Sequence, residues 1–278
     1  MSDTKADVTA LTKRDCDITD INKVRDIISS KFFDCIINAS AYTQVDDAEC
    51  NQEIANLVNE SAVANICNLL KDTKTLFVHF STDYVFDGAS EVGYKENDNP
   101  KPINTYGLSK LNGEKAIVQS CTNYLIFRTS WVYSAYGSNF PKTILENYKQ
   151  HKALKVVDDQ YGVPNHVEFI CDSVFICINK FLGMSDTQKQ EVSGIYHISC
   201  TGQTSWYHFS KYLLEEYREK YNDKRDYALE AIKSHEIQLK AKRPNYSVLN
   251  CDKIVKQFDI VLAPWQHYVD KFLTQTHE

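Results

Sequence analysis

Glycine is scarce in this sequence and unevenly distributed. Only nine of the 278 residues are glycine, and the first of them is Gly88. Gly-rich loops hold nucleotide phosphates because glycine lets the backbone approach the ligand closely. The residues before Gly88 therefore exclude a phosphate-binding loop of either common type from this part of the chain.

Several other features are also missing. The net charge of −6 argues against the electrostatic footprint of a nucleic-acid binder. No apolar run approaches the ~18 residues of a membrane span, and residues 1–14 are polar, unlike a signal peptide. The nine cysteines are an odd number without a CxxC pair, which predicts buried thiols in a reducing compartment. We therefore expect a cytoplasmic protein without nucleic-acid or membrane partners.

Apolar, strand-like runs alternate with amphipathic, helical ones. This order predicts an α/β fold with a doubly wound parallel sheet of the Rossmann type. We expect residues 1–150, joined by 190–200, to form the sheet domain, and residues 151–278 to form a smaller lobe. The expected strands are 7–11, 35–39, 75–81, 124–129, 154–157 and 195–199. The expected helices begin near residue 21, after a cap at Thr19 or Asp20, and cover 52–70, 106–119, 139–148, 167–182 and 205–221. Residues 183–193 are predicted to be a surface loop, and 222–244 a polar stretch with little periodicity.

Tyr106 and Lys110 form a Tyr-x-x-x-Lys pair near the start of a predicted helix. The i, i+4 spacing places both side chains on one helix face. An ammonium beside a phenol favours the phenolate and lowers the pKa of the tyrosine, which can then exchange a proton with a carbonyl or hydroxyl group. The spacing alone is more typical of a solvated helix face, since Tyr148 is also followed by a lysine four residues later.

Polar and aromatic residues follow three of the predicted strands, at 38–43, 81–86 and 129–133. Because ligands bind at the carboxyl ends of parallel strands, these clusters are expected to meet at one edge of the sheet. His79 alternates within its strand and is predicted to be buried structure rather than a catalytic group.

The sequences STDYVFDG (81–88), NTYGLSKLNGEKA (104–116), FRTSWVYS (127–134) and DDQYGVP (158–164), with Arg243-Pro244 and Ser247, resemble the dTDP-4-dehydrorhamnose reductase family. This is a family of extended short-chain dehydrogenases/reductases, and the resemblance runs from Asp7 to the end. It implies NADPH-dependent reduction of the 4-keto group of dTDP-4-dehydro-6-deoxy-L-mannose to dTDP-L-rhamnose. It leaves NADH as an alternative cofactor and UDP as an alternative nucleotide.

The resemblance also implies roles for individual residues. Tyr106 corresponds to the general acid at C4, Lys110 to the group that tunes Tyr106 and binds the nicotinamide ribose, and Thr82 to the hydroxyl at the carbonyl. The implied substrate-binding residues are Asp83, Tyr84, Trp131, Arg243 and Ser247, where the Arg243 guanidinium suits a diphosphate.

The implied cofactor-binding residues follow the strand at 35–39 or precede the first helix. They are Ala39, Ser40, Ala41, Thr43 and Asn59, together with Asp17 and Ile18 on the adenine side and Arg14 (or Lys13) near a 2′-phosphate. Some family members use Mg²⁺, but no ligand cluster in this sequence requires it. A homodimer is compatible with this resemblance.

The sequence departs from the family pattern at its beginning. The family opens with a strand and a Gly-x-x-Gly-x-x-Gly loop, whereas this chain begins where the second strand is expected. The hypothesis that follows is a truncated reductase that binds NADPH poorly or is inactive. A second alternative is a non-catalytic protein that resembles the regulatory β subunit of methionine adenosyltransferase, and a third is a related sugar-nucleotide epimerase or reductase.

Overall fold

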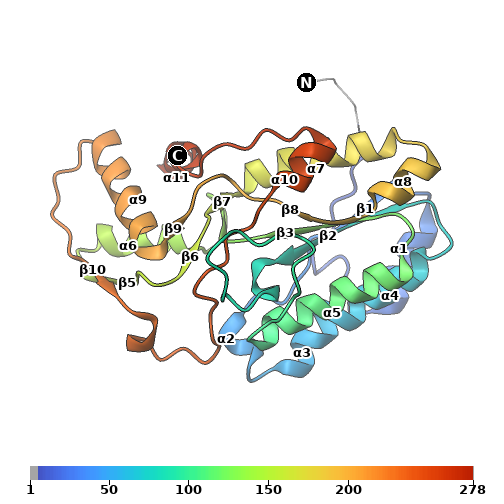
Figure 1. Ribbon diagram of the computed structural model, residues 1–278, viewed down its shortest axis with the longest axis horizontal. Helices are drawn as coiled ribbons and strands as arrows, with labels where there is room; N and C mark the ends of the chain where they lie inside the picture. Colours follow the sequence, from blue (N-terminus) through green and yellow to red (C-terminus); the bar gives the residue numbers. More distant parts are fainter. Residues whose placement is uncertain (1–5, 278) are drawn as a thin grey trace.

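A four-stranded parallel sheet forms the centre of the molecule (Figure 1). The structure is a computed structural model, which describes residues 6–277. The strand order in the sheet is β1-β2-β3-β8, with every neighbouring pair parallel. The bounds are β1 Cys35–Asn38, β2 Leu76–Thr82, β3 Tyr124–Thr129 and β8 Gly194–His197. The predicted α/β class is confirmed, and β8 returns to the sheet as expected.

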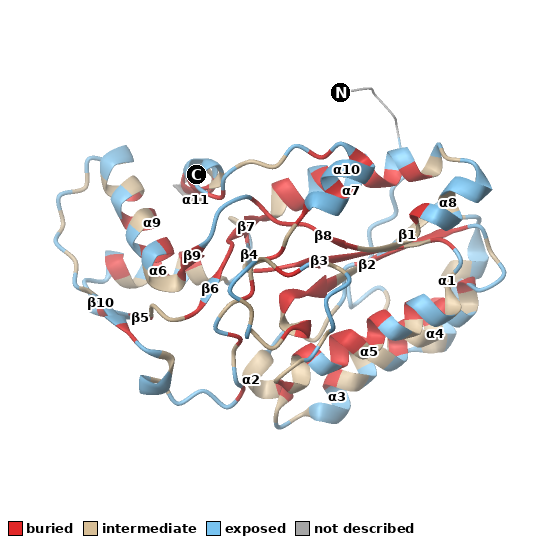
Figure 2. Ribbon diagram, in the orientation of Figure 1, coloured by how far each residue is buried: buried red, intermediate tan, exposed pale blue. Residues whose placement is uncertain are grey.

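Helices cover both faces of this sheet because its inner strands are apolar on both sides (Figure 2). Phe77 and Ile126 point to one face and pack with buried residues of α1 and α4 and with Ile117 of α5. Val78 and Phe127 point to the other face, into the larger core that includes α7 and α10. The helices on the first face are α1 Ile21–Ser30, α4 Ala62–Leu70 and α5 Thr105–Ser120, and those on the second are α7 Val167–Leu182 and α10 Asp252–Phe258.

The remaining elements lie beside the carboxyl ends of the strands or at the periphery (Figure 1). Three two-stranded sheets pair β5 with β10, β4 with β7, and β6 with β9. Their bounds are β4 Val132–Tyr133, β5 Leu154–Val157, β6 Tyr161–Gly162, β7 Asn165–His166, β9 Thr204–Ser205 and β10 Leu229–Ile232. The other helices are α2 Val45–Ala48, α3 Gln52–Asn56, α6 Phe140–Lys149, α8 Asp186–Val192, α9 Trp206–Lys220 and α11 His267–His277, with 3₁₀ turns at Asp83–Val85 and Ser234–Glu236. In the described part of the chain, no helix has the length and apolar character that crossing a membrane requires.

Three sequence predictions of local structure are wrong. Residues 7–11 form no strand and are exposed. The predicted loop at 183–193 contains α8, which begins at a capping box formed by Ser185 and Gln188. The polar stretch 222–244, predicted to have little periodicity, contains β10, which pairs with β5 in a peripheral two-stranded sheet.

The predicted helix at 52–70 is interrupted by a π turn, Leu57–Ser61, between α3 and α4. A π turn adds one residue and rotates the following helix face by about 100°. Ile54 and Leu57 are therefore 50% and 46% exposed, whereas Ile66 and Leu70 are buried. The apolar side chains of 52–70 therefore do not form one continuous buried stripe.

Strand β1 is less buried than predicted. The apolar run Cys35-Ile36-Ile37 is typical of a buried strand, but Ile37 is 44% exposed. Within residues 6–277, β1 pairs only with β2, so one of its edges carries no neighbouring strand.

Candidate active site

The end of β2 and the start of α5 form the centre of the predicted site. Thr82 ends β2, and the 3₁₀ turn that follows carries Asp83 and Tyr84. Asn104 caps α5 by accepting a hydrogen bond from the Gly107 backbone N–H at 2.8 Å. A Cβ at Gly107 would lie 2.2 Å from the Tyr84 carbonyl oxygen, so glycine is required for α5 to approach this turn.

The Thr82 hydroxyl connects the two elements. Its Oγ1 accepts a hydrogen bond from the Tyr84 backbone N–H at 3.2 Å and lies 3.1 Å from Oδ1 of Asp83. It also shares a hydrogen bond with the Tyr106 phenol that acts to lower the pKa of that phenol. The Tyr84 and Tyr106 rings meet edge to face with centroids 5.9 Å apart. A hydroxyl and a phenol thus converge at the carboxyl end of β2, as the motifs predicted.

The expected lowering of the Tyr106 pKa by Lys110 is wrong for this structure. Burial is the largest influence and raises the pKa of Tyr106 to about 12. Nζ of Lys110 lies within hydrogen-bond distance of His79 Nε2, at 3.1 Å. Within the described residues it makes no hydrogen bond to the Tyr106 phenol. Burial also lowers the pKa of Lys110 to about 8, against the opposing charge of Glu114. The resting site therefore holds a protonated phenol.

Asp83 is a buried carboxylate that is 3% exposed. Burial raises its pKa to about 7, although hydrogen bonds from Ser247 and Thr82 act in the opposite direction. Its Oδ2 has no hydrogen-bond partner within the described residues. The predicted substrate residues Asp83 and Ser247 are thus in contact, and one carboxylate oxygen is buried without a hydrogen-bond partner.

Arg243 reaches this centre from the carboxyl-terminal part of the chain. It forms a bidentate ion pair with Asp46 of α2, with Nη1–Oδ1 and Nη2–Oδ2 distances of 2.8 and 2.5 Å. Its guanidinium also hydrogen-bonds the Tyr84 phenol and lowers the pKa of that group, although burial raises it more. The carboxyl-terminal segment thereby closes over α2, near the bottom of the view in Figure 1.

Trp131 lies apart from the contacts that surround Tyr106. It follows β3 with a left-handed backbone φ of 45°. Its indole stacks on Trp206, the first residue of α9, with centroids 3.5 Å apart and planes 9° apart. Gly162 lies directly beneath, since a Cβ there would be 2.6 Å from the indole.

The predicted cofactor residues fall into two groups. Ala39, Ser40, Ala41 and Thr43 lie in the loop that follows β1, beside Asn38. Asn59 in the π turn accepts from the Tyr42 N–H at 2.8 Å, and its Nδ2 donates to Ser109 at 2.9 Å, which joins this loop to α5. Its amide is therefore engaged with the protein, and cofactor contact stays a prediction.

The adenine-side residues occupy the approach to α1. Asp17 accepts hydrogen bonds from Thr19 and pairs with Lys13 at 3.6 Å. Arg14 is exposed, and Ile18 is half-buried. In residues 6–277, no hydrogen bond or ion pair joins these residues to the Tyr106 centre.

The nicotinamide half of a dinucleotide fits the described residues. Tyr106 and Lys110 lie one helical turn apart on α5, and Thr82 faces the phenol. Residues 1–34 contain no glycine, since the first glycine in the sequence is Gly88. The described residues include no group of three or more His, Cys, Asp or Glu side chains placed to hold a metal ion.

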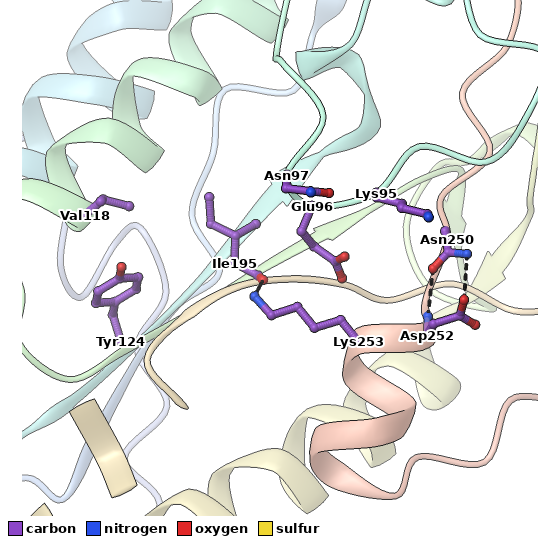
Figure 3. Close-up of a pocket in the computed structure, with 9 residues that line it drawn as sticks. All are labelled: Lys95, Glu96, Asn97, Val118, Tyr124, Ile195, Asn250, Asp252 and Lys253. Carbon is purple, nitrogen blue, oxygen red and sulfur yellow. Dashed lines mark hydrogen bonds between the residues drawn. The ribbon is translucent and has the colours of Figure 1, made fainter. Parts of the chain in front are cut away.

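A cavity of about 600 Å³ lies elsewhere, along the outer edge of β8 (Figure 3). Its lining mixes charges of both signs, and none of the predicted site residues contributes to it. Glu96 accepts from the His197 N–H at 2.9 Å, and Lys253 donates to the Ile195 carbonyl at 2.7 Å. This cavity lies between the edge strand β8 and the side chains that cover it, and it is separate from the predicted active site.

Two residues of the site were missed from the sequence. Asn104 carries an ordinary signal for a helix N-cap, an Asn directly before a helical run. No sequence signal connects Asp46 with Arg243, which lies 197 residues away in the chain.

The sequence matches the RmlD substrate binding domain family over residues 1–278. The chain belongs to this family. It is 38% identical over 242 residues to a dTDP-4-dehydrorhamnose reductase of Salmonella typhimurium, covering 87% of this chain and 79% of that protein.

Two solved structures are similar to the chain along nearly its whole length. A dTDP-4-dehydrorhamnose reductase from Bacillus anthracis in complex with NADP is 32% identical, with a TM-score of 0.85 over 97% of this chain and 90% of that one. A dTDP-4-dehydrorhamnose reductase from Clostridium acetobutylicum is 28% identical, with a TM-score of 0.89 over 100% and 93%. The predicted family and the Rossmann-type fold are confirmed. These names favour the reductase over a regulatory subunit of methionine adenosyltransferase.

Proposed function

We propose that this member of the RmlD substrate binding domain family reduces the 4-keto group of dTDP-4-dehydrorhamnose to give dTDP-L-rhamnose, with NADPH as the reductant. The observation that carries this proposal is the contact between the Thr82 hydroxyl and the protonated Tyr106 phenol at the end of β2. The names of the similar proteins support the choice of substrate and cofactor.

The residues of this chain supply a proton and an orientation. The Thr82 hydroxyl donates a hydrogen bond to the carbonyl oxygen and holds it beside Tyr106. As negative charge develops on that oxygen, the Tyr106 phenol transfers its proton to it, which is general acid catalysis. NADPH, when bound, supplies the hydride. Lys110 and the loop at 39–43 would hold its nicotinamide side.

Substrate binding is assigned to residues that surround this centre. The Arg243 guanidinium is planar and donates in pairs, which suits a diphosphate. The buried Oδ2 of Asp83 has no hydrogen-bond partner within the described residues, and we assign it to accept from a sugar hydroxyl. We assign cofactor binding to residues 1–150 with 190–200, and substrate binding to residues 151–278. Trp131 of the first part and Trp206 of the second would form the wall between the two parts.

The setting of the reaction follows from the same proposal. A cytoplasmic reductase explains the free thiols, of which Cys67, Cys177, Cys200 and Cys251 are buried, whereas Cys50 and Cys171 are exposed. A nucleotide-sugar substrate requires no nucleic-acid or membrane partner, and a homodimer is compatible with it.

The test is NADPH oxidation with dTDP-4-dehydrorhamnose, followed at 340 nm. Wild-type protein is expected to turn over, and Tyr106→Phe to lose at least about 100-fold in kcat, because one general acid contributes that much. Tyr136→Phe is the control, since the Tyr136 side chain is 83% exposed. Equal rates for the wild type and Tyr106→Phe would refute the catalytic assignment.

A further inference from the structure

Two thiols meet where α4 packs against the end of α5, on one face of the central sheet (Figure 1). Cys67 lies on α4 and is 0% exposed. Cys121 directly follows Ser120, the last residue of α5, and is half-buried beside the exposed Thr122. Cys67 belongs to the apolar core on this face, and Cys121 packs against that core. The two side chains share a hydrogen bond, so the fold brings one buried and one accessible sulfur together.

The two sulfur atoms differ in how readily they ionise. The hydrogen bond with Cys121, followed by burial, raises the pKa of Cys67, so this thiol keeps its proton. The same hydrogen bond lowers the pKa of Cys121, although its partial burial acts in the opposite direction. The Cys67 S–H therefore donates, and the Cys121 sulfur accepts. Because oxidants react with accessible thiolates, Cys121 is the member of the pair that an oxidant meets first.

A second pair of neighbouring thiols lacks this asymmetry. Cys200 and Cys251 are 4% and 6% exposed, and the charge of one acts on the other. Burial raises the pKa of each of them to about 12. Buried thiols of this kind are inert toward oxidants. The Cys200 and Cys251 pair is therefore an internal control for the effect of proximity alone.

We propose that Cys67 and Cys121 form a peroxide-sensitive dithiol that closes to a reversible disulfide between α4 and the end of α5. The oxidant is hydrogen peroxide. Neither NADPH nor a sugar nucleotide takes part, so the pair would respond to peroxide whether or not the protein is a reductase.

The oxidation has two steps. The Cys121 thiolate attacks one oxygen of hydrogen peroxide, the O–O bond breaks, and hydroxide leaves and becomes water with the proton that the thiol released. Cys121 is now a sulfenic acid. The Cys67 sulfur attacks the Cys121 sulfur, the S–O bond breaks, and the departing hydroxide takes the Cys67 proton to form a second water. Two thiols are oxidised to one disulfide, and one peroxide is reduced to two waters.

The disulfide would enclose the residues from Cys67 to Cys121, which include β2 and the whole of α5. Because the sulfur atoms are already in hydrogen-bond contact, a small movement of the side chains is sufficient to join them. Tyr106 lies at the other end of α5, about 22 Å away along the helix. The cross-link therefore restricts the unfolded chain and leaves the Tyr106 centre in place.

The first test maps disulfides in the wild-type full chain after treatment with hydrogen peroxide and alkylation of the remaining thiols. Cleavage after Lys, Arg and Glu isolates Cys67 in residues 61–71 and Cys121 in residues 116–128. The expected result in mass spectrometry is a linked pair of these two peptides, which dithiothreitol separates. The absence of this linked pair, or a link between Cys200 and Cys251 that forms sooner, overturns the proposal.

The second test assigns the order of the two steps. In Cys67→Ala, peroxide should leave Cys121 as a sulfenic acid that dimedone traps, because no second thiol is present to resolve it. In Cys121→Ala, Cys67 should stay unreacted. Dimedone on Cys67 in Cys121→Ala, or none on Cys121 in Cys67→Ala, overturns the roles of the two thiols.

The third test is the melting temperature of the oxidised protein. The disulfide is expected to raise it by at least about 4 °C, and dithiothreitol should reverse the rise. Cys67→Ala, treated with peroxide in the same way, is the control for oxidation of the exposed Cys50 and Cys171 and should show no rise. A melting temperature that falls in the wild type but not in this control overturns the stabilising effect of the cross-link.

Discussion

Asp46 and Arg243 form the bidentate ion pair that fastens the carboxyl-terminal segment to α2. The Asp46 carboxylate also accepts from the Ala241 N–H at 2.9 Å, so it orders the backbone as well as the guanidinium. Arg243 is thereby aimed at Tyr84 before any substrate arrives. Preorganisation of this kind reduces the entropy that binding has to overcome.

Asp46→Asn is expected to raise KM for the nucleotide sugar about tenfold and to change kcat by less than about threefold, because Arg243 loses its orientation and not its charge. Steady-state kinetics measure both constants. Asp186→Asn removes a carboxylate from an exposed pair with Lys74 and serves as the control. A fall in KM would contradict the prediction, since it would mean that Asp46 competes with the substrate for Arg243.

Gly162→Ala is expected to push the Trp131 indole away from Trp206. The new Cβ would lie 2.6 Å from the indole. Circular dichroism should lose the signal of the stacked pair, and kcat/KM should fall by at least about tenfold as the site wall moves. Gly183→Ala is the matched control, because the nearest atom there is 3.6 Å away. An unchanged tryptophan signal would show that the indole does not occupy this position.

The stability of Asp83→Asn relative to the wild type is expected to increase as the pH rises. Burial raises the folded-state pKa of Asp83 to about 7, above its ordinary value of 3.8, so the folded form holds the proton more tightly. Ionising this group therefore destabilises the wild type between about pH 4 and pH 7, and the penalty is constant above that range. Thermal unfolding of both proteins from pH 4 to about pH 8 measures the difference in melting temperature. A difference that does not vary with pH would show that Asp83 is not a perturbed acid.

Arg128→Met is expected to cost about 3–5 kcal/mol of unfolding free energy, because it leaves Glu114 as an uncompensated buried charge. The two side chains are 1% and 2% exposed, and Ser81 also bonds Glu114 at 2.5 Å. Urea unfolding of the double variant Glu114→Leu/Arg128→Met should show a smaller loss than Arg128→Met alone. Lys155→Met, in an exposed pair, is the control. A loss below about 1 kcal/mol for Arg128→Met would contradict a structural role for this pair.

The parts of the fold that depend on local pattern were predictable. The strand at 124–129 and the helix at 167–182 agree with β3 and α7 in both bounds. Their apolar periodicity reflects burial on the sheet, which is strong and continuous there. The prediction of a strand at 7–11 was wrong because an apolar pattern alone does not provide a hydrogen-bonding neighbour.

The parts of the site that depend on long-range contact were not predictable. Motifs brought Thr82, Tyr106 and Lys110 to one place, but they assigned Lys110 to Tyr106 and His79 to the core. The structure pairs His79 with Lys110 because the register of β1 with β2 brings Asn38 beside the ring. The pattern of one strand does not contain the register between two strands.

The two outer edges of the central sheet differ in how they can meet other molecules. At β8, side chains from Glu96 and Lys253 bind the backbone groups that a further strand would use. No side chain within residues 6–277 does this along β1, where Ile37 faces solvent. Side chains that occupy the backbone groups of an edge strand oppose edge-to-edge pairing, and among the described residues they do so at β8. A solubilising substitution such as Ile37→Lys belongs on the β1 side.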